Sequence, residues 1–180
     1  MKLQRMSLVM VQVYDDILPK EVCHYLINLF DQSEGHEFVN QDHKPCFTQV
    51  NINQHHPDLV RPLISYVRSV YQKYISDTGS KYLPKLKCLE EFRIKRYNVG
   101  GDERFDEHVD VMDHESAKRV VSFLFYLNDN DGSTKFTDRV EVVPKEGRVV
   151  VFPPTWEYPH SGLPPKNKTK YIMSTYIHYG

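Results

Sequence analysis

The feature that most constrains the fold of this chain is a series of strand-like runs in its second half. From residue 87 onward, short segments rich in β-branched and aromatic residues alternate with turn sequences. The strand-like segments are EFRIKRY, RVVSFLFYLN, RVEVVP, GRVVVF and KYIMSTYIHY, and turns such as NVGGDE, NDNDGS and PKEG separate them. Several short strands with such turns predict an antiparallel sandwich or barrel.

The first half of the chain is predicted to be mainly helical. Apolar residues recur at helical spacing in 18–32 and in 56–79, and the second segment ends at Gly79, a common helix stop. The segment 35–55 between them is polar and irregular, with a short strand predicted at FTQVNI. An apolar run near the start, interrupted by Gln12, is interpreted as a first strand because no cleavage site of a signal peptide follows it. The predicted fold class is α+β, mainly β, with helices packed outside a sheet.

Composition narrows the function classes. The chain has 180 residues, which suits one domain, and its 23 Lys and Arg against 24 Asp and Glu give a formal charge of −1. This balance does not favour a nucleic-acid or membrane-surface partner, and no apolar run reaches the ~20 residues needed to span a bilayer. The three cysteines, Cys23, Cys46 and Cys88, form neither a zinc pattern nor a disulfide framework. We therefore expect a reducing, cytoplasmic setting.

The run FDEHVDVMDH carries the first candidate site residues. His108 and Asp110 stand two positions apart, so on a strand both side chains point to one face. His160, which follows the strand-like run GRVVVF, could join them through a loop. Two histidines and one carboxylate on one face form the facial triad of non-haem Fe(II) oxygenases. The alternative is a solvated turn, because this spacing taken alone is weak.

Lys170 and Tyr126 form a second candidate cluster. Lys170 opens the last strand-like run, where a lysine is unusual unless it meets an anion, and alternation places it on one face with Ile172, Ser174 and Tyr176. Tyr126 ends another strand-like run. An ammonium group and a phenol could together bind one carboxylate in a closed pocket through charge-assisted hydrogen bonds.

Taken in order, these motifs resemble a known family. The run RY-NVGGDERFDEHVD, then RVVSFLFYLND, GSTKF, VVPKEGRVVVF, PHSG and TKYIMSTYI is similar to the prolyl 4-hydroxylase branch of the Fe(II)/2-oxoglutarate dioxygenases, over roughly residues 90–178. The resemblance implies a single dioxygenase domain over 1–180. Within it, 87–180 would be a double-stranded β-helix, or jelly-roll, core, and 1–86 would supply bracing helices and a lid region.

The resemblance also implies roles for individual residues. His108, Asp110 and His160 would be the iron ligands, as catalytic and metal-binding residues. For 2-oxoglutarate, Lys170 and Tyr126 would hold the distal carboxylate, and Tyr97 would line its pocket. The implied cofactors are Fe(II), 2-oxoglutarate and O₂, with ascorbate as a reductant. Asp110 stands where related halogenases have a small residue, which favours hydroxylation.

Two departures from the family pattern concern turns. The family shows two glycines and an acid before T-x-F, whereas this chain reads DGSTKF at 131–136. The glycine usual before the basic residue is missing from KNKTK. A lysine at 170, where the oxygen-sensing branch has arginine, is typical of the collagen-type, plant and microbial enzymes.

The expected reaction is hydroxylation of a prolyl residue in a peptide or protein by a monomer or weak dimer. One alternative is a hydroxylase of a free amino acid or other small molecule. Another is a non-catalytic binding or sensor module, and a third is a cupin-like zinc or manganese enzyme.

Candidate substrate contacts are Arg93 and Trp156. Arg93 and Lys95 form either a solvated rim or a basic wall suited to an anionic substrate, and Trp156 either packs beneath the His160 loop or stacks on substrate. The polar segment 35–56 is a candidate lid.

The other histidines and Asp113 are expected to be structural. Asp113 and His114 are expected in a solvated turn. His55 and His56 are expected at the start of a helix, and His178 is expected at the far end of the last strand.

Overall fold

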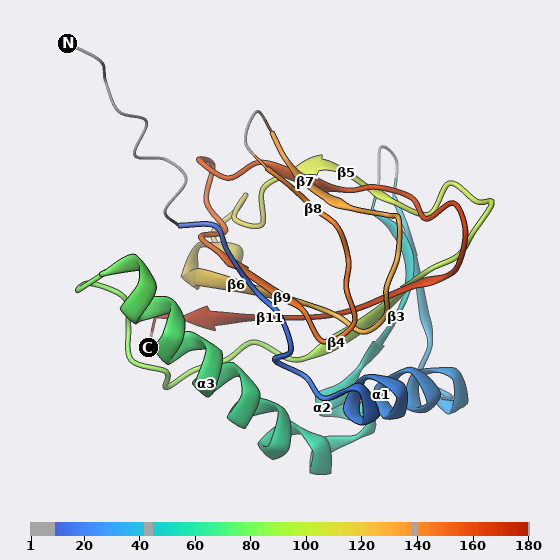
Figure 1. Cartoon of the computed structure of the whole chain (residues 1–180), viewed down its shortest axis with the longest axis horizontal. Helices are drawn as coiled ribbons and strands as arrows, with labels where there is room; N and C mark the ends of the chain where they lie inside the picture. Colours follow the sequence, from blue (N-terminus) through green and yellow to red (C-terminus); the bar gives the residue numbers. More distant parts are fainter. Residues whose placement is uncertain (1–9, 42–44, 138–139, 180) are drawn as a thin grey trace.

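The structure is a computed structural model that describes residues 10–41, 45–137 and 140–179, and within them the strands form two antiparallel sheets (Figure 1). The large sheet contains, in spatial order, β1 (Gln12–Tyr14), β9 (Val149–Phe152), β6 (Arg119–Tyr126), β11 (Lys170–His178), β4 (Arg93–Tyr97), β3 (Cys46–Asn51) and β2 (Glu37–Asn40). The small sheet contains β5 (Phe105–His108), β10 (His160–Gly162), β7 (Thr134–Phe136) and β8 (Glu141–Val142). The two sheets face each other as a jelly-roll, which confirms the predicted fold class.

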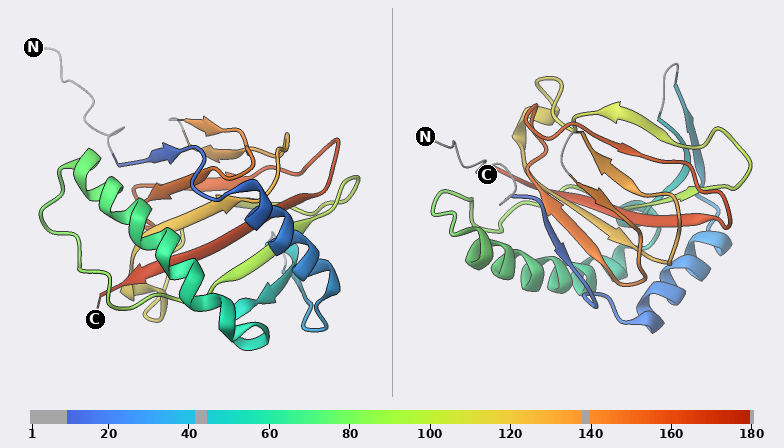
Figure 2. Two further views of the ribbon diagram at one scale, coloured as in Figure 1. Left: turned by 60° about the horizontal axis from the view of Figure 1, so that its bottom comes forward. Right: turned by 45° about the horizontal axis from the view of Figure 1, so that its top comes forward.

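Two helices cover the outer face of the large sheet (Figure 2). They are α1 (Lys20–Gln32) and α3 (Val60–Thr78), as the helical spacing predicted. Gly79 ends α3 in a left-handed conformation, φ 64°, which glycine adopts without steric cost. The short α2 (Ile52–His55) and two single 3₁₀ turns, 57–59 and 116–118, lie in the connections.

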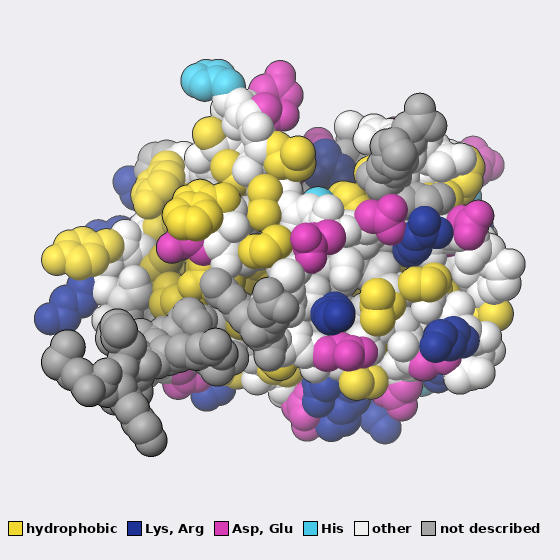
Figure 3. Space-filling view, turned by 90° about the horizontal axis from the view of Figure 1, so that it is seen from above, with side chains coloured by type: hydrophobic (Ala, Val, Ile, Leu, Met, Phe, Trp, Pro, Cys, Tyr) yellow, Lys and Arg dark blue, Asp and Glu magenta, His cyan; other side chains and the backbone are white. Residues whose placement is uncertain are grey.

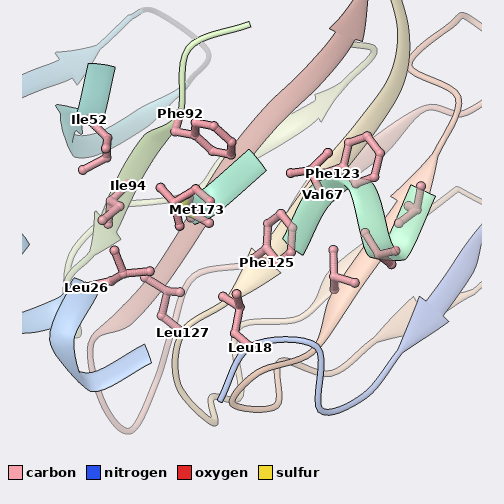
Figure 4. Close-up of a cluster of buried hydrophobic side chains, with 14 of the residues drawn as sticks. Leu18, Leu26, Ile52, Val67, Phe92, Ile94, Phe123, Phe125, Leu127 and Met173 are labelled. Atoms are coloured by element: carbon pink, nitrogen blue, oxygen red, sulfur yellow. The ribbon is translucent and has the colours of Figure 1, made fainter. Parts of the chain in front are cut away.

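Alternation along the strands separates two apolar clusters. The larger cluster lies between the helices and the large sheet, where Leu26 of α1 and Val67 of α3 meet Phe123, Phe125 and Met173 (Figure 4). All five side chains are at most 1% exposed, and burial of each contributes about 1.5–3 kcal/mol.

A second cluster lies between the two sheets. It contains Phe47, Tyr97, Tyr126, Phe136, Val142, Val150, Phe152, Tyr158 and Ile172. On β11, Met173 and Ile177 join the helix-side cluster, whereas Ile172 belongs to this one. Side chains of alternate parity on one strand therefore serve the outer core and the space between the sheets.

The segment predicted to be irregular is more ordered than the sequence indicated. β2 pairs with β3, and β3 pairs with β4, so 37–40 and 46–51 extend the edge of the large sheet. The predicted strand FTQVNI corresponds to β3. Of the predicted first strand, β1 pairs with β9, and residues 1–9 lie outside the described part of the chain. The segment is polar because one side of this edge hairpin faces solvent, and polarity alone does not distinguish such a hairpin from a loop.

The cysteines and the helices agree with what the composition predicted. The three cysteines are free, with Cys23 and Cys46 buried and Cys88 exposed. No helix within the described residues is both long enough and apolar enough to cross a membrane.

Candidate active site

The small sheet brings the two candidate histidine ligands together. β5 and β10 run antiparallel, and His160 lies directly opposite His108 in their register. Asp110 follows two residues after His108, just beyond the end of β5. One potential ligand atom from each of these three residues lies within 4.8 Å of the others. The strand pairing, rather than the loop alone, therefore assembles the facial triad.

Main-chain carbonyls orient both imidazole rings. Nδ1 of His108 is 2.8 Å from the carbonyl oxygen of Asp106, and Nδ1 of His160 is 3.0 Å from that of Tyr158. A carbonyl oxygen only accepts, so Nδ1 of each ring carries the proton and Nε2 keeps its lone pair. The Nε2 atoms lie 3.6 and 3.8 Å from the two carboxylate oxygens of Asp110. Both lone pairs are thus available beside one carboxylate, as metal ligation requires.

The surroundings of Asp110 leave one oxygen for a metal. Oδ1 accepts a hydrogen bond from Tyr176 at 3.0 Å, whereas Oδ2 is buried and has no hydrogen-bond partner among the described residues. Burial alone would raise the pKa of Asp110, but the two neighbouring histidines and the hydrogen bond from Tyr176 outweigh it and hold the pKa below its usual value. Burial lowers the pKa of His160, which keeps its ring neutral. An ionised carboxylate with an unpaired buried oxygen between two neutral imidazoles fits a divalent iron.

The main chain around Asp110 is also held in place. The backbone N–H groups of Asp110 and Val111 both donate to the carbonyl oxygen of Pro154, each at 3.1 Å. Arg119 donates to the carbonyl oxygen of Asp110 at 2.8 Å and forms a bidentate pair with Glu90. These bonds limit the freedom of the ligand loop before any metal binds.

Lys170 is a buried cation without a buried anion. Lys170 is only 2% exposed. Its Nζ donates hydrogen bonds to the carbonyl oxygens of Gly132 at 3.0 Å and Leu163 at 2.8 Å. It forms no ion pair with any residue in the described ranges, and burial lowers its pKa to about 7. An ammonium group has three protons, so one donor remains for a carboxylate. The residue thus fits the distal carboxylate of 2-oxoglutarate.

Gly132 explains part of the unusual turn sequence. A Cβ at this position would lie 2.7 Å from the carbonyl oxygen of Leu163, which is one of the two acceptors of Lys170. A side chain at 132 would therefore push against the group that positions the lysine. This one glycine is sterically required, although the family pattern of two glycines is not met.

One partly open cavity between the sheets joins the triad to Lys170. Its lining is drawn from both sheets: Lys95, Tyr97, Phe105, His108, Asp110, Ser122, Leu124, Thr134, Phe152, His160, Gly162, Lys170, Ile172, Ser174 and Tyr176. Tyr97 lies in this lining, as the resemblance implied. Tyr126 does not, since its hydroxyl donates to Thr134 Oγ1 at 2.7 Å, and Thr134 faces the cavity instead. The direct contact between Tyr126 and the cosubstrate stays a prediction.

The cavity opens into a larger cleft of about 1020 Å³. The two spaces share Lys95, Phe105, His108, Asp110, Ser174 and Tyr176. Arg93 lines the cleft but not the cavity. On the face seen in Figure 3, acidic and basic side chains are interspersed, without an extended area of one charge.

Trp156 differs from the packing interpretation. It is 78% exposed and belongs to the lining of neither space, so it does not pack beneath the His160 loop. Its aromatic ring and the neighbouring prolines suggested burial, but the loop turns this side chain outward. A substrate contact by Trp156 stays a prediction.

Asp113, His56 and His178 each contact a neighbouring side chain or turn, and their expected structural role stays a prediction. Asp113 caps the 116–118 turn by accepting from the N–H and hydroxyl of Ser116. His56 contacts Ser33, and His178 lies 2.9 Å from a carboxylate oxygen of Glu90.

Sequence reasoning missed two residues of the site. Alternation placed Tyr176 on the face of Lys170, but its hydrogen bond to Asp110 was not foreseen. Thr134 was noted only within a turn motif. Even spacing along a strand could have identified both residues, because side chains an even number of positions apart share a face. Tyr176 is six residues from Lys170, and Thr134 is two residues from the buried Phe136.

The comparison with protein families agrees with this geometry. Residues 92–178, from the start of β4 to the end of β11, match the model of the 2OG-Fe(II) oxygenase superfamily. This region of the chain therefore matches a superfamily that uses Fe(II), 2-oxoglutarate and O₂, and the cluster of His108, Asp110 and His160 fits the iron. A search of curated proteins found no match.

Solved structures with the same fold are prolyl hydroxylases. A viral collagen prolyl hydroxylase from Paramecium bursaria Chlorella virus-1, in complex with 2-oxoglutarate, has a TM-score of 0.73 and 19% identity, covering 98% of this chain and 100% of the other. A Trichoplax adhaerens prolyl hydroxylase, in complex with a hypoxia-inducible-factor peptide, has a TM-score of 0.74 and 17% identity, covering 97% and 86%. A Pseudomonas putida prolyl-4-hydroxylase has a TM-score of 0.71 and 18% identity, covering 97% and 95%. At these identities, the likeness shows the shared fold.

Proposed function

We propose that this dioxygenase hydroxylates a prolyl residue in a peptide or protein. The observation that carries the proposal is the continuity of the two spaces: the cavity with the triad and Lys170 opens directly into the cleft. A 2-oxoglutarate bound at the cavity end leaves the cleft side of the triad for substrate. The prolyl hydroxylases with the same fold support the choice of a prolyl target.

The residues of the site have distinct tasks in this reaction. His108, Asp110 and His160 would hold the iron, and Lys170 would bind the distal carboxylate of 2-oxoglutarate. When bound, iron and 2-oxoglutarate would supply oxidative decarboxylation. One atom of O₂ would enter the substrate as hydroxyl and the other would enter succinate, with release of CO₂. Tyr176 orients Asp110 through its hydrogen bond to Oδ1.

The lining of the cavity excludes water from the reacting groups. Phe105 stacks on the ring of His108 with 3.4 Å between the centroids, and Phe152 packs edge-on against His160 at 4.8 Å. Leu124 and Ile172 add apolar surface between the triad and Lys170. A dry site strengthens the interaction of Lys170 with a carboxylate and limits side reactions.

The size of the cleft favours a peptide over a free amino acid. Its volume of about 1020 Å³ is at the upper end of the range of roughly 300–1,000 Å³ for small-molecule sites. Met112, 78% exposed, and Phe47 of β3 lie in its lining and offer apolar contacts to a proline-rich segment. A small-molecule substrate would leave much of this surface uncovered.

The β2–β3 hairpin borders the cleft, which supports the prediction that 35–56 acts as a lid. Gln41, Pro45 and Phe47 belong to the cleft lining. Limited proteolysis with and without a substrate peptide would test this, and unchanged cleavage of 36–50 would count against a lid.

The first experiment tests the cofactor site without substrate. Metal-free protein is loaded anaerobically with Fe(II) and then with 2-oxoglutarate, and the visible charge-transfer band of the chelate is recorded. We expect the band in the wild type, its loss in Asp110→Ala, and about 100-fold weaker 2-oxoglutarate binding in Lys170→Met, because a buried charge pair is removed. Lys168→Met is the matched control, since Lys168 is exposed two residues away.

The second experiment tests the prolyl target. Proline-containing peptides are incubated with the loaded enzyme and O₂, and succinate release is measured together with a mass gain of one oxygen atom on proline. Hydroxylated peptide supports the proposal. Formation of the band without hydroxylation of any peptide, but with turnover of a free amino acid, would replace it by the small-molecule alternative.

We also propose three finer properties. Free cysteines, two of them buried, support a reducing compartment such as the cytoplasm. Ascorbate is expected to prolong turnover as a reductant, which activity with and without ascorbate would show. A monomer or weak dimer is expected in light scattering.

A further inference from the structure

Two basic residues on one face of β4 differ in their partners. Arg93 is neutralised by two carboxylates, with guanidinium nitrogens 3.3 Å from Glu90 and 2.7 Å from Glu91. Lys95, two residues along the same strand, has no hydrogen bond or ion pair from its ammonium group to any residue that the structure describes. Its ammonium group makes a cation–π contact with Phe47, with Nζ 5.0 Å from the centre of the ring.

The position of Lys95 is equally distinctive. It belongs to the lining of the cavity and of the outer cleft, so it stands where the two spaces meet, beside Asp110. A substrate that lies in the cleft next to Asp110 is therefore close to this ammonium group. A positive charge at this point can therefore contact a group close to the carbon that is oxidised.

An unpaired cation in such a place costs free energy. Burial lowers the pKa of Lys95 to about 8, an effect that the charges of Arg93 and Arg119 reinforce and those of Asp110 and Glu90 oppose. The group is still mainly protonated at neutral pH. Lys95 is partly buried, and charges withdrawn from water are ordinarily paired, so a cation left without a carboxylate of its own chain is suited to one from a ligand.

We propose that Lys95 binds a carboxylate of the substrate, which makes it a specificity-determining residue. The inference rests on the proposed function and refines it: the preferred substrate carries an anionic group next to the hydroxylated residue. The carboxylate comes either from an acidic side chain in a peptide or from the α-carboxylate of a free amino acid.

The rest of the cleft makes this recognition local. Glu107, Asp113 and Glu115 also line the cleft and repel anions, whereas Arg119 is held by Glu90. The other lysine of the lining, Lys118, is exposed to solvent, which screens its charge. An anionic group is therefore attracted at Lys95 and disfavoured along the acidic part of the rim. The arrangement selects one register of the substrate rather than binding acidic molecules in general.

The alternative partner for the Lys95 ammonium group is the cosubstrate, and the test must distinguish it from the substrate. Lys95 could instead serve the cosubstrate, by balancing the charge of the loaded iron site from beside Asp110. In that case its removal would weaken 2-oxoglutarate binding and leave substrate preference unchanged. The two roles are separated by measuring both affinities in the same variant.

The experiment uses the anaerobic enzyme loaded with Fe(II) and 2-oxoglutarate, and it measures substrate affinity through the change in the charge-transfer band. Two matched pairs of probes are compared: proline peptides with Glu or Gln beside the proline, and free proline or prolinamide. The proteins are the wild type, Lys95→Met, and Lys135→Met as a control. Lys135 is an exposed strand lysine on β7 and belongs to the lining of neither space.

We expect the wild type and Lys135→Met to prefer the anionic member of one pair by about tenfold or more, the size expected for a charge-assisted hydrogen bond. Lys95→Met should lose that preference and retain its affinity for 2-oxoglutarate. A preference in the peptide pair identifies an acidic side chain as the source, and one in the proline pair identifies the α-carboxylate.

The outcomes distinguish this inference from the proposed function. If free proline shows a Lys95-dependent preference and no peptide binds, carboxylate recognition stands and the peptide function fails. If neither pair shows a preference and Glu and Gln peptides are hydroxylated equally in all three proteins, the peptide function stands and the role of Lys95 is overturned. A preference that survives in Lys95→Met, no preference in either pair, or a loss of 2-oxoglutarate affinity alone would also overturn it.

Discussion

The two sheets of this molecule differ in what they contribute. Strands of the large sheet reach nine residues in β11, and two helices bury its outer face. Strands of the small sheet have two to four residues, yet this sheet carries both candidate histidine ligands. The large sheet with its helices therefore supplies most of the apolar burial, and the small sheet supplies the two candidate histidine ligands.

The polar content of the two interiors follows the same division. On the helix side of the large sheet, the packed side chains are mainly apolar, and the buried Thr175, which shares a strand face with Met173 and Ile177, donates its hydroxyl to the carbonyl oxygen of Glu90. Between the sheets, the buried residues include His160, Lys170, Ser174 and Thr134. Buried polar groups reduce stability unless they are paired, so they are concentrated where ligands will pair with them. Stability and chemistry are thus separable by mutation.

The largest expected effect is on the small sheet. His108→Ala removes one metal ligand, and kcat/KM should fall at least about 1000-fold, whereas the free energy of unfolding of the metal-free protein should change by less than about 2 kcal/mol. Activity assays and urea denaturation check this. His114→Ala, at an exposed histidine in the following turn, is the control and should be unchanged. A large loss of stability in His108→Ala alone would contradict the separation.

The next effect concerns the large sheet. Phe123 of β6 is fully buried against the helices, so Phe123→Ala should lower the free energy of unfolding by about 3–5 kcal/mol. Because the side chain points away from the cavity, the folded fraction should bind 2-oxoglutarate with wild-type affinity. Denaturation and chelate titration at low temperature measure the two quantities. Weakened binding in the folded protein would show that the layers are coupled.

A smaller effect tests the connection between the sheets. Tyr176 of β11 donates to Asp110, so Tyr176→Phe should weaken Fe(II) affinity about tenfold, as for other groups that orient metal ligands. Isothermal titration with Fe(II) under anaerobic conditions measures it. Tyr179→Phe, at an exposed tyrosine, is the control. Equal affinities in all three proteins would mean that the small sheet alone positions Asp110.

The last effect is a pH dependence of the free energy of unfolding. Burial lowers the pKa of Lys170 in the folded protein to about 7, from its usual value of 10.5. Between these values the unfolded chain holds a proton that the folded protein lacks, so this residue makes the free energy of unfolding rise with pH from about 7 to about 10.5. Lys170→Met should flatten that part of the profile, measured on metal-free protein, and Lys168→Met should not. An unchanged slope would mean that Lys170 is not desolvated.

Much of the fold was accessible from pattern alone. Helical spacing predicted α1 and α3, and alternation predicted the long strands and the inward face of β11, because these periodicities record which side of an element is buried. The hairpin partner β2 was missed, since a four-residue edge strand with largely exposed side chains has no apolar signal. The orientation of Trp156 was wrong because a loop has no periodicity from which to read it.

The sequence by itself determined the chemistry that this protein can perform: a histidine and an aspartate at the spacing of one strand face, a second histidine, and a lysine at an inward position. These residue types and their spacing along the chain can be read directly from the sequence. Only the tertiary structure decided that His160 lies opposite His108, that Tyr176 supports Asp110, and that Arg93 is paired while Lys95 is not. Such differences depend on partners from distant strands, so neighbouring lysine and arginine residues that look alike in sequence acquire different roles when the sheets pack.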